Sequence, residues 1–150
     1  METYRVSFIG HRKIYRIKEI EEFLNRYIYD LLSKKEYVEF YVGRNGDFDV
    51  IVASVIKNVQ SAFGKHNSSL NLVLPYRSKD EEYYADFYDE ICLPIDAKTH
   101  FKSAISKRNE WMIDNSDLLI SYVEDQHGGA YTAQKYAKRK GVETINISCI

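Results

Sequence analysis

A glycine-containing loop from Gly43 to Asp49 carries residue types that bind phosphate. It separates a β-rich run from a helical pattern, and it holds a second glycine, Gly46. Glycines allow the backbone to approach a ligand closely, and the first amides of a helix point at an anion. Arg44 adds a planar donor fork, and Asp47 and Asp49 can accept hydrogen bonds from ribose hydroxyls. The alternative is a structural turn in which Asp47 only caps the helix.

A second loop of this kind precedes the last helical pattern. Gly128 and Gly129 stand at its start and predict a further anion cradle, while Tyr131 could stack on a base. The segment lacks the three spaced glycines of the dinucleotide-binding fingerprint. It also lacks the Lys-Ser/Thr ending of a P-loop. The sequence therefore does not support a dinucleotide-dependent dehydrogenase or a P-loop NTPase.

A third set of candidates follows other strand patterns. Gly10, His11 and Arg12 end the first strand pattern, where the histidine could titrate or hydrogen-bond and the arginine could pair with phosphate. Tyr76 follows another strand pattern and could stack on a base. Arg108 lies within a helical pattern and could turn toward the same pocket, although arginines in helices are more often exposed.

The remaining polar residues indicate no metal site and no cofactor. His66, His100 and His127 do not have the spacing of a zinc site, and the acidic pairs are too generic to indicate magnesium. No serine lies in a nucleophile-elbow motif. Cys92 and Cys149 match no metal spacing, so we expect buried free thiols on strands rather than a disulfide or a ligand pair.

Strand and helix patterns alternate along the whole chain. Strand patterns occupy 4–9, 37–42, 70–74, 91–93, 117–123 and 143–147. Helical patterns occupy 17–32, 51–63, 80–88, 99–115 and 128–140. This alternation predicts an α/β protein, a Rossmann-like three-layer sandwich whose mostly parallel sheet has helices on both faces. In such sheets ligands bind outside the carboxyl ends of the strands, where the three loops fall.

Length and composition are those of an ordinary globular chain. The 150 residues predict one domain over 1–150, with 45% hydrophobic and 29% charged residues. No apolar run approaches the roughly 20 residues of a membrane span. The N-terminus has no secretory signal pattern, so we expect a cytoplasmic location. The net charge of -1 argues against nucleic acid as a partner, because nucleic-acid binding normally needs a clustered basic surface.

Several segments in this order and spacing together resemble the SLOG superfamily. They are 6–12, 43–49, 107–112, 115–117 and the glycine pair at 128–129. The likeness spans nearly the whole chain and is closest to the small YpsA/YoqJ-like bacterial and prophage proteins. That branch implies a Rossmann-like fold and a pocket for a nucleotide ligand. Related domains imply sensing of signalling nucleotides in bacterial conflict systems.

The same superfamily contains the Lonely-Guy phosphoribohydrolases, whose motif differs from this chain in its acidic residue. The segment 128–132 keeps the leading glycines and Thr132 but has Tyr131 where the family has a third glycine. Gln134 and Lys135 stand where acids are expected, and neither can act as a carboxylate does. The resemblance thus implies phosphate binding at Gly128, Gly129 and Thr132, and it leaves catalysis open.

We expect the chain to bind a nucleotide-like small molecule, sensing or sequestering it, with the phosphate at the helix starts near Gly46 and Gly129. One alternative is an enzyme that cleaves or transfers an N-glycosidic bond, with Asp49 or Glu124 supplying the acid. Another is a module that contacts a protein or single-stranded DNA, as the Smf-type relatives do. The sequence leaves open whether the chain forms a homo-oligomer.

Overall fold

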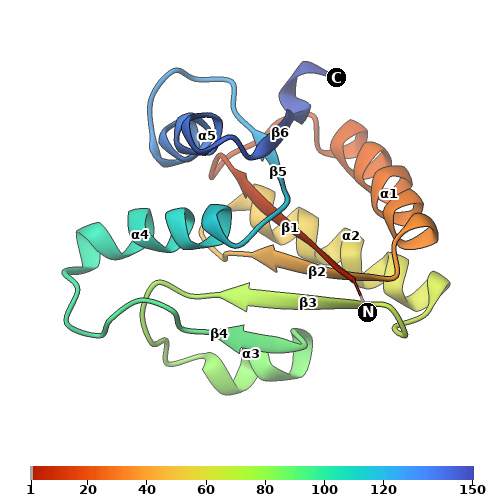
Figure 1. The fold of residues 1–150 in the computed structure, drawn as a ribbon, viewed down its shortest axis with the longest axis horizontal. Coiled ribbons are helices and arrows are strands. Elements are labelled where there is room, and N and C mark those ends of the chain that lie inside the picture. Colours follow the sequence, from red (N-terminus) through yellow and green to blue (C-terminus); the bar gives the residue numbers. More distant parts are fainter. Residues whose placement is uncertain (1) are drawn as a thin grey trace.

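The strands form one parallel sheet. The structure is a computed structural model that describes residues 2–150. It contains β1 (Thr3–Gly10), β2 (Tyr37–Val42), β3 (Ser68–Val73), β4 (Glu90–Cys92), β5 (Leu118–Tyr122) and β6 (Glu143–Asn146). Their order is β4-β3-β2-β1-β5-β6, and every neighbouring pair is parallel (Figure 1). The parallel sheet predicted from the alternating patterns is confirmed.

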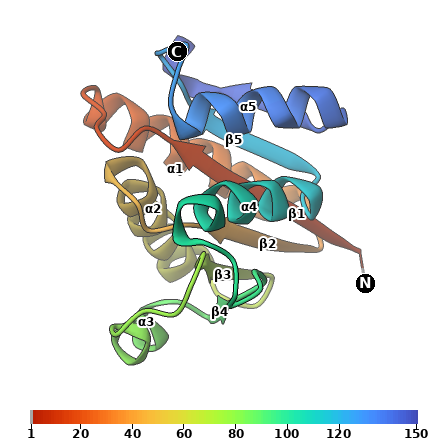
Figure 2. The same ribbon diagram turned by 90° about the vertical axis from the view of Figure 1, so that its left-hand side faces the viewer.

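Helices cover both faces of this sheet. The pair α1 (Ile17–Lys34) and α2 (Asp47–Phe63) packs on one face, and the pair α4 (Phe101–Asp114) and α5 (Gly129–Lys140) packs on the other (Figure 2). The short α3 (Glu81–Phe87) has no buried residue and contacts the edge strand β4. The expected Rossmann-like three-layer arrangement is therefore confirmed.

The strand order reverses at β1. The chain builds outward from β1 through β2 and β3 to β4, and α4 then carries it back to β5 on the other side of β1 (Figure 1). The connections that leave the carboxyl ends of β1 and β5 go to opposite faces of the sheet. This divergence opens a crevice at the point where α/β proteins of this kind bind ligands.

Two apolar clusters hold the layers together. The larger lies between the sheet and the α1–α2 pair and includes the fully buried Phe8 and Phe40. The smaller lies beneath α4 and α5 and includes Met112, Ala133 and Ala137. Alanines on the inner side of α5 allow that helix to lie close to β5, which brings its N-terminus near the end of β1.

The C-terminal cysteine departs from expectation. Cys92 is half-buried on β4, but Cys149 is exposed in a 3-10 helix, Ile147–Cys149, and both thiols are free. The chain leaves the sheet at Asn146, whose Oδ1 accepts hydrogen bonds from the backbone amides of Ser148 and Val123. The prediction of a buried strand cysteine is wrong for Cys149, because this turn directs the last residues away from the core.

No helix within residues 2–150 combines the length and apolar character needed to span a membrane.

Candidate functional site

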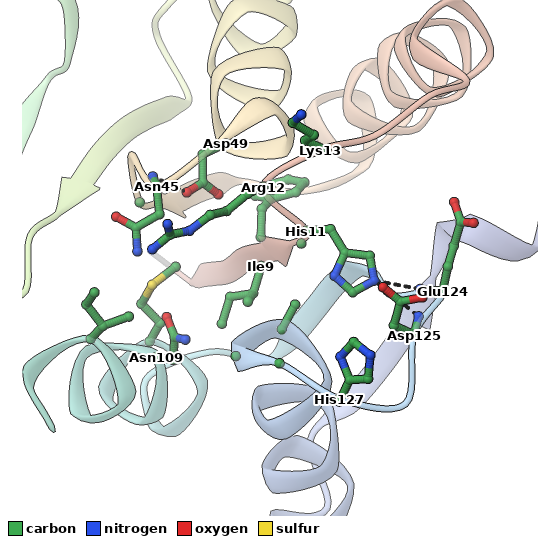
Figure 3. Close-up of a pocket in the computed structure, with 18 of the residues that line it drawn as sticks. Ile9, His11, Arg12, Lys13, Asn45, Asp49, Asn109, Glu124, Asp125 and His127 are labelled. Atoms are coloured by element: carbon green, nitrogen blue, oxygen red, sulfur yellow. Dashed lines mark hydrogen bonds between the residues drawn. The ribbon is translucent and has the colours of Figure 1, made fainter. Parts of the chain in front are cut away.

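A cavity of about 610 Å³ lies at the carboxyl ends of β1, β2 and β5 (Figure 3). The structure brings nine of the predicted residues together in its walls. They are Gly10, His11 and Arg12 after β1, Gly43 and Asp49 around the start of α2, Arg108 on α4, and Glu124, Gly128 and Gly129 before and at the start of α5. The three loops chosen from the sequence therefore converge on one space.

Arg44 does not line this cavity. Its Nη1 donates a hydrogen bond to the Tyr88 hydroxyl at 3.3 Å, and its guanidinium lies 4.9 Å from the centre of the Tyr84 ring. The side chain thus fastens the segment around α3 to the end of β2. We expected it to pair with phosphate, but its position among aromatic rings favours a structural role instead.

Gly46 and Asp47 join two loops instead of facing the cavity. A Cβ on Gly46 would lie 2.4 Å from the Cα of Arg12, and the Asp47 amide donates to the Arg12 carbonyl at 2.8 Å. Gly46 is the N-cap of α2, and no side chain caps this helix. The structure therefore supports neither Asp47 as a cap nor Gly46 as an open anion cradle.

The remaining predicted residues also lie outside the lining of the cavity. Tyr76 is exposed beyond β3, and Tyr131 lies beneath the amino group of Lys135, 5.5 Å from its ring centre. The Thr132 hydroxyl donates to the Gly128 carbonyl and stays on its own helix. None of these three side chains is placed to stack or bond with a ligand inside the cavity.

His11 ties the loop after β1 to the loop after β5. Its Nε2 accepts hydrogen bonds from the backbone amides of Glu124, at 2.8 Å, and Asp125, at 3.3 Å (Figure 3). The histidine therefore shapes the rim of the cavity.

A buried arginine and a buried aspartate form the wall below the loop after β2. Asp49 Oδ2 accepts from the Asn45 amide at 2.9 Å, and Arg108 Nη1 donates to the Val73 carbonyl at 2.9 Å. Burial raises the pKa of Asp49, while the hydrogen bond from the Asn45 backbone amide and the positive charge of Arg108 act to lower it. Burial likewise lowers the pKa of Arg108, opposed by the charge of Asp49.

Gly43 makes room for this pair. A Cβ there would lie 2.7 Å from Arg108 Nη1 and 3.1 Å from Asp49 Oδ2. Any larger residue would force the Arg108 guanidinium to shift within the wall. The glycine is therefore required by packing within the wall and not by a ligand.

The glycine pair at the start of α5 has no such packing partner. Gly128 has φ +94°, a conformation that favours glycine, and it is the N-cap of the helix. A Cβ on either Gly128 or Gly129 would meet no atom within 4 Å. At Gly129, where φ is not positive, neither backbone conformation nor packing requires glycine. Gly128, Gly129 and Ala130 line the cavity, and the first amides of a helix have no partner within the helix.

Arg12 is the cation placed to act in the cavity. In Figure 3 its side chain extends toward Asn45 and Asp49, whereas Lys13 turns away from the centre. Within residues 2–150, the exposed Arg12 side chain forms neither an ion pair nor a hydrogen bond. Its donors are therefore available to a ligand.

Tyr15, which is not among the residues predicted from the sequence, also lines the cavity and is 79% exposed. No motif marks this residue, and only its place two residues after Lys13, on the loop that follows β1, could have suggested it. Its ring presents a free apolar surface at the rim.

Gln134 and Lys135 do not line the cavity. Gln134 is buried and accepts a hydrogen bond from the Ser121 hydroxyl on β5, so it faces the sheet. The cavity instead contains the carboxyls of Asp49 and Glu124, and Glu124 accepts a hydrogen bond from the Tyr122 hydroxyl. Both carboxyls already have partners within the chain.

The comparisons with known proteins find similarity in fold alone. No family model matches the chain, and no curated protein matches its sequence. The structure is similar to DNA processing protein A (DprA) from Streptococcus pneumoniae, with a TM-score of 0.66 and 11% identity. DNA processing protein A from Helicobacter pylori, described by its single-stranded DNA binding mode, gives a TM-score of 0.66 and 14% identity.

These likenesses span almost all of this chain but only part of the other proteins. They cover 94% of this chain in both cases, against 49% of the Streptococcus protein and 63% of the Helicobacter protein. They support the Smf-type part of the sequence resemblance at the level of the Rossmann-like fold. The narrower likeness to the YpsA/YoqJ-like branch stays a prediction.

The expectation that net charge argues against nucleic acid is wrong. The Helicobacter protein has the same fold and binds single-stranded DNA. The net charge of -1 is a sum over 21 basic and 22 acidic residues, and it says nothing of where the cations lie. A local cation such as Arg12, at an open helix start, is independent of that sum.

Proposed function

We propose that this chain binds single-stranded nucleic acid by holding a nucleotide phosphate in the cavity at the ends of β1, β2 and β5. The observation that carries the proposal is the meeting of two free donor groups in one space. These are the N-terminus of α5 at Gly128 and Gly129, and the guanidinium of Arg12, which has no hydrogen-bond or ion-pair partner among residues 2–150.

The start of α5 suits a phosphate for two reasons. The first amides of a helix have no partner within the helix, and the helix dipole places partial positive charge at this end. Glycines without neighbours let an anion reach these amides directly.

Arg12 and Tyr15 would complete the contact with a nucleotide. The guanidinium can donate two parallel hydrogen bonds to phosphate oxygens. The exposed ring of Tyr15 can stack on a base, and such stacking tolerates any base sequence. A charged donor beside an aromatic platform is the usual combination in sites for single strands.

The similarity in fold to a protein that binds single-stranded DNA supports a strand over a free nucleotide. The nucleotide-like small molecule expected from the sequence would use the same phosphate chemistry. The two ligands differ in what lies beyond the first nucleotide, so an experiment must compare them directly.

The observations favour binding over cleavage of a glycosidic bond. Asp49 lies in the cavity wall with a raised pKa, as a catalytic acid would. However, Asp49 Oδ2 accepts a hydrogen bond from the backbone amide of Asn45. The Glu124 carboxylate likewise accepts a hydrogen bond from the Tyr122 hydroxyl. A carboxyl that stabilises its own loop is poorly placed to transfer a proton to a substrate.

Fluorescence anisotropy with a labelled oligothymidylate over a salt series tests the proposal, with unlabelled thymidine 5′-monophosphate as competitor. Arg12→Ala should weaken binding and reduce the slope of log affinity against log salt by about one. Arg26→Ala removes an exposed arginine on α1, outside the cavity, and serves as the matched control. Equal effects of the two variants, or no binding at low salt, would overturn the proposal. Equal affinity for the mononucleotide would identify the ligand as a free nucleotide.

A further inference from the structure

A groove of about 350 Å³ runs between α4 and α5 and adjoins the cavity. Ile105, Asn109 and Gly129 line both spaces, so the groove is continuous with the cavity. Both volumes are within the range of roughly 300–1,000 Å³ that is usual for small-molecule sites. The site therefore has a side branch that the cavity alone does not account for.

A hydrogen bond joins the two helices that form the groove. Ala133 lies on its α5 side, where a small side chain leaves space between the helices. At the C-terminal end of α4, the Tyr136 hydroxyl donates to the Asp114 carboxylate, with distances of 2.8 and 3.0 Å to its two oxygens. This contact ties the helices together.

The lining of the groove combines a cation, hydroxyls and apolar surface. Lys102 is exposed in the first turn of α4, and Ser106 lies one turn further along. Ile105 and Ala133 provide apolar walls, and Glu110 is the single acid in the lining. A phosphate can therefore contact Lys102 while a flat apolar group lies deeper between the helices.

We infer that the α4–α5 groove is a second nucleotide subsite, which takes the nucleotide next to the one whose phosphate lies at the start of α5. This inference rests on the proposed function. Its own support is the shared lining at Ile105, Asn109 and Gly129, together with the exposed amino group of Lys102 in the lining of the groove. A strand passing from cavity to groove would cross the start of α5 without leaving the protein surface.

The inference commits to a ligand of at least two nucleotides. Titration calorimetry would compare thymidine 5′-monophosphate with the 5′-phosphorylated dinucleotide of thymidine and with a hexanucleotide. The dinucleotide should bind at least about fivefold tighter than the mononucleotide, because it adds a phosphate contact and an apolar contact.

Two pairs of variants place the second nucleotide. Ser106→Glu puts a negative charge in the groove, and Ser103→Glu puts the same charge on an exposed position of α4 outside it. Lys102→Ala removes the cation of the groove, and Lys107→Ala removes an exposed lysine elsewhere on α4. Ser106→Glu and Lys102→Ala should abolish most of the gain of the dinucleotide over the mononucleotide. Their partners should leave that gain unchanged.

The outcomes separate this inference from the proposed function. If mononucleotide and oligonucleotide both fail to bind, the proposed function fails and this inference fails with it. If oligonucleotides bind but Ser106→Glu matches Ser103→Glu, the groove holds no nucleotide and only this inference is overturned. The same conclusion follows if the dinucleotide gains nothing over the mononucleotide. All four positions are exposed, and circular dichroism would verify that each variant is folded.

Discussion

Replacing Gly129 by alanine tests whether this position needs glycine for ligand binding or for packing within the fold. The new Cβ meets no atom within 4 Å, and the backbone there has no positive φ. Alanine at a compatible glycine position stabilises a protein by about 0.4–1 kcal/mol, because it restricts the unfolded chain. For a chain of this length, that free energy raises Tm by roughly 1–4 °C. Gly129→Ala should therefore leave the fold slightly more stable.

The same methyl group should weaken binding. It would project from the first residue of α5, where a phosphate must come within about 3 Å of the amides to form hydrogen bonds. Loss of one hydrogen bond to a charged group costs about 1.5–3 kcal/mol, which is roughly a 10- to 150-fold loss of affinity. Stability and affinity should thus change in opposite directions.

Gly46→Ala is the matched comparison. Its Cβ would lie 2.4 Å from the Cα of Arg12, so the backbone of one loop must move. Overpacking of this kind costs about 1–3 kcal/mol, which lowers Tm by roughly 2–12 °C. Thermal unfolding and oligothymidylate anisotropy would be measured on both variants. Unchanged binding by Gly129→Ala, or a loss of stability equal to that of Gly46→Ala, would refute the reasoning.

Three further predictions concern the walls of the cavity. Arg108→Ala should lower the free energy of unfolding by about 1–3 kcal/mol or more, because it leaves the Val73 carbonyl without its hydrogen-bond donor. Urea denaturation measures this change, and an unchanged free energy of unfolding would contradict the prediction. His11→Ala should speed hydrogen exchange at the Glu124 amide, which loses its acceptor, and unchanged exchange would show that the loop is held otherwise. Burial raises the pKa of Asp49 above its ordinary 3.8, against the opposing effects of its partners, so the native state holds that proton more tightly than the unfolded state does. Stability is therefore lost as pH rises from about 4 through the raised pKa, and Asp49→Asn should gain stability relative to the parent chain between acid and neutral pH. A difference that is constant with pH would contradict the last prediction.

The elements could be predicted because their signals are local. The strand pattern at 37–42 coincides with β2, and the helical pattern at 128–140 ends at Lys140, as α5 does. The next residue, Gly141, has φ +76°, a conformation that favours glycine at the end of a helix. Periodicity and turn chemistry act over a few residues, so they are visible in the chain itself. The end of each strand, and hence the edge on which the loops meet, followed from these patterns.

Side-chain directions could not be predicted in the same way. Arg44 lies between the two glycines of its loop. As an arginine it is as suitable for binding phosphate as Arg12 is. Its direction is decided by Tyr84 and Tyr88, which lie about 40 residues further along the chain. No local pattern contains that information. Tyr15 was missed for the complementary reason, because nothing in its sequence neighbourhood marks an aromatic ring at the rim of a cavity.

The glycines show where the sequence argument changes most. From the sequence alone, a phosphate site is equally expected at Gly43, Gly46 and Gly129, since each of these glycines precedes or begins a helix. In the structure, Gly43 makes room for Arg108 and Gly46 makes room for the Arg12 backbone, whereas Gly129 adjoins open space. A glycine that packing already explains is no evidence for a ligand. The two anion cradles expected from the sequence therefore reduce to one, at the start of α5, and the case for a phosphate site depends on that helix together with Arg12.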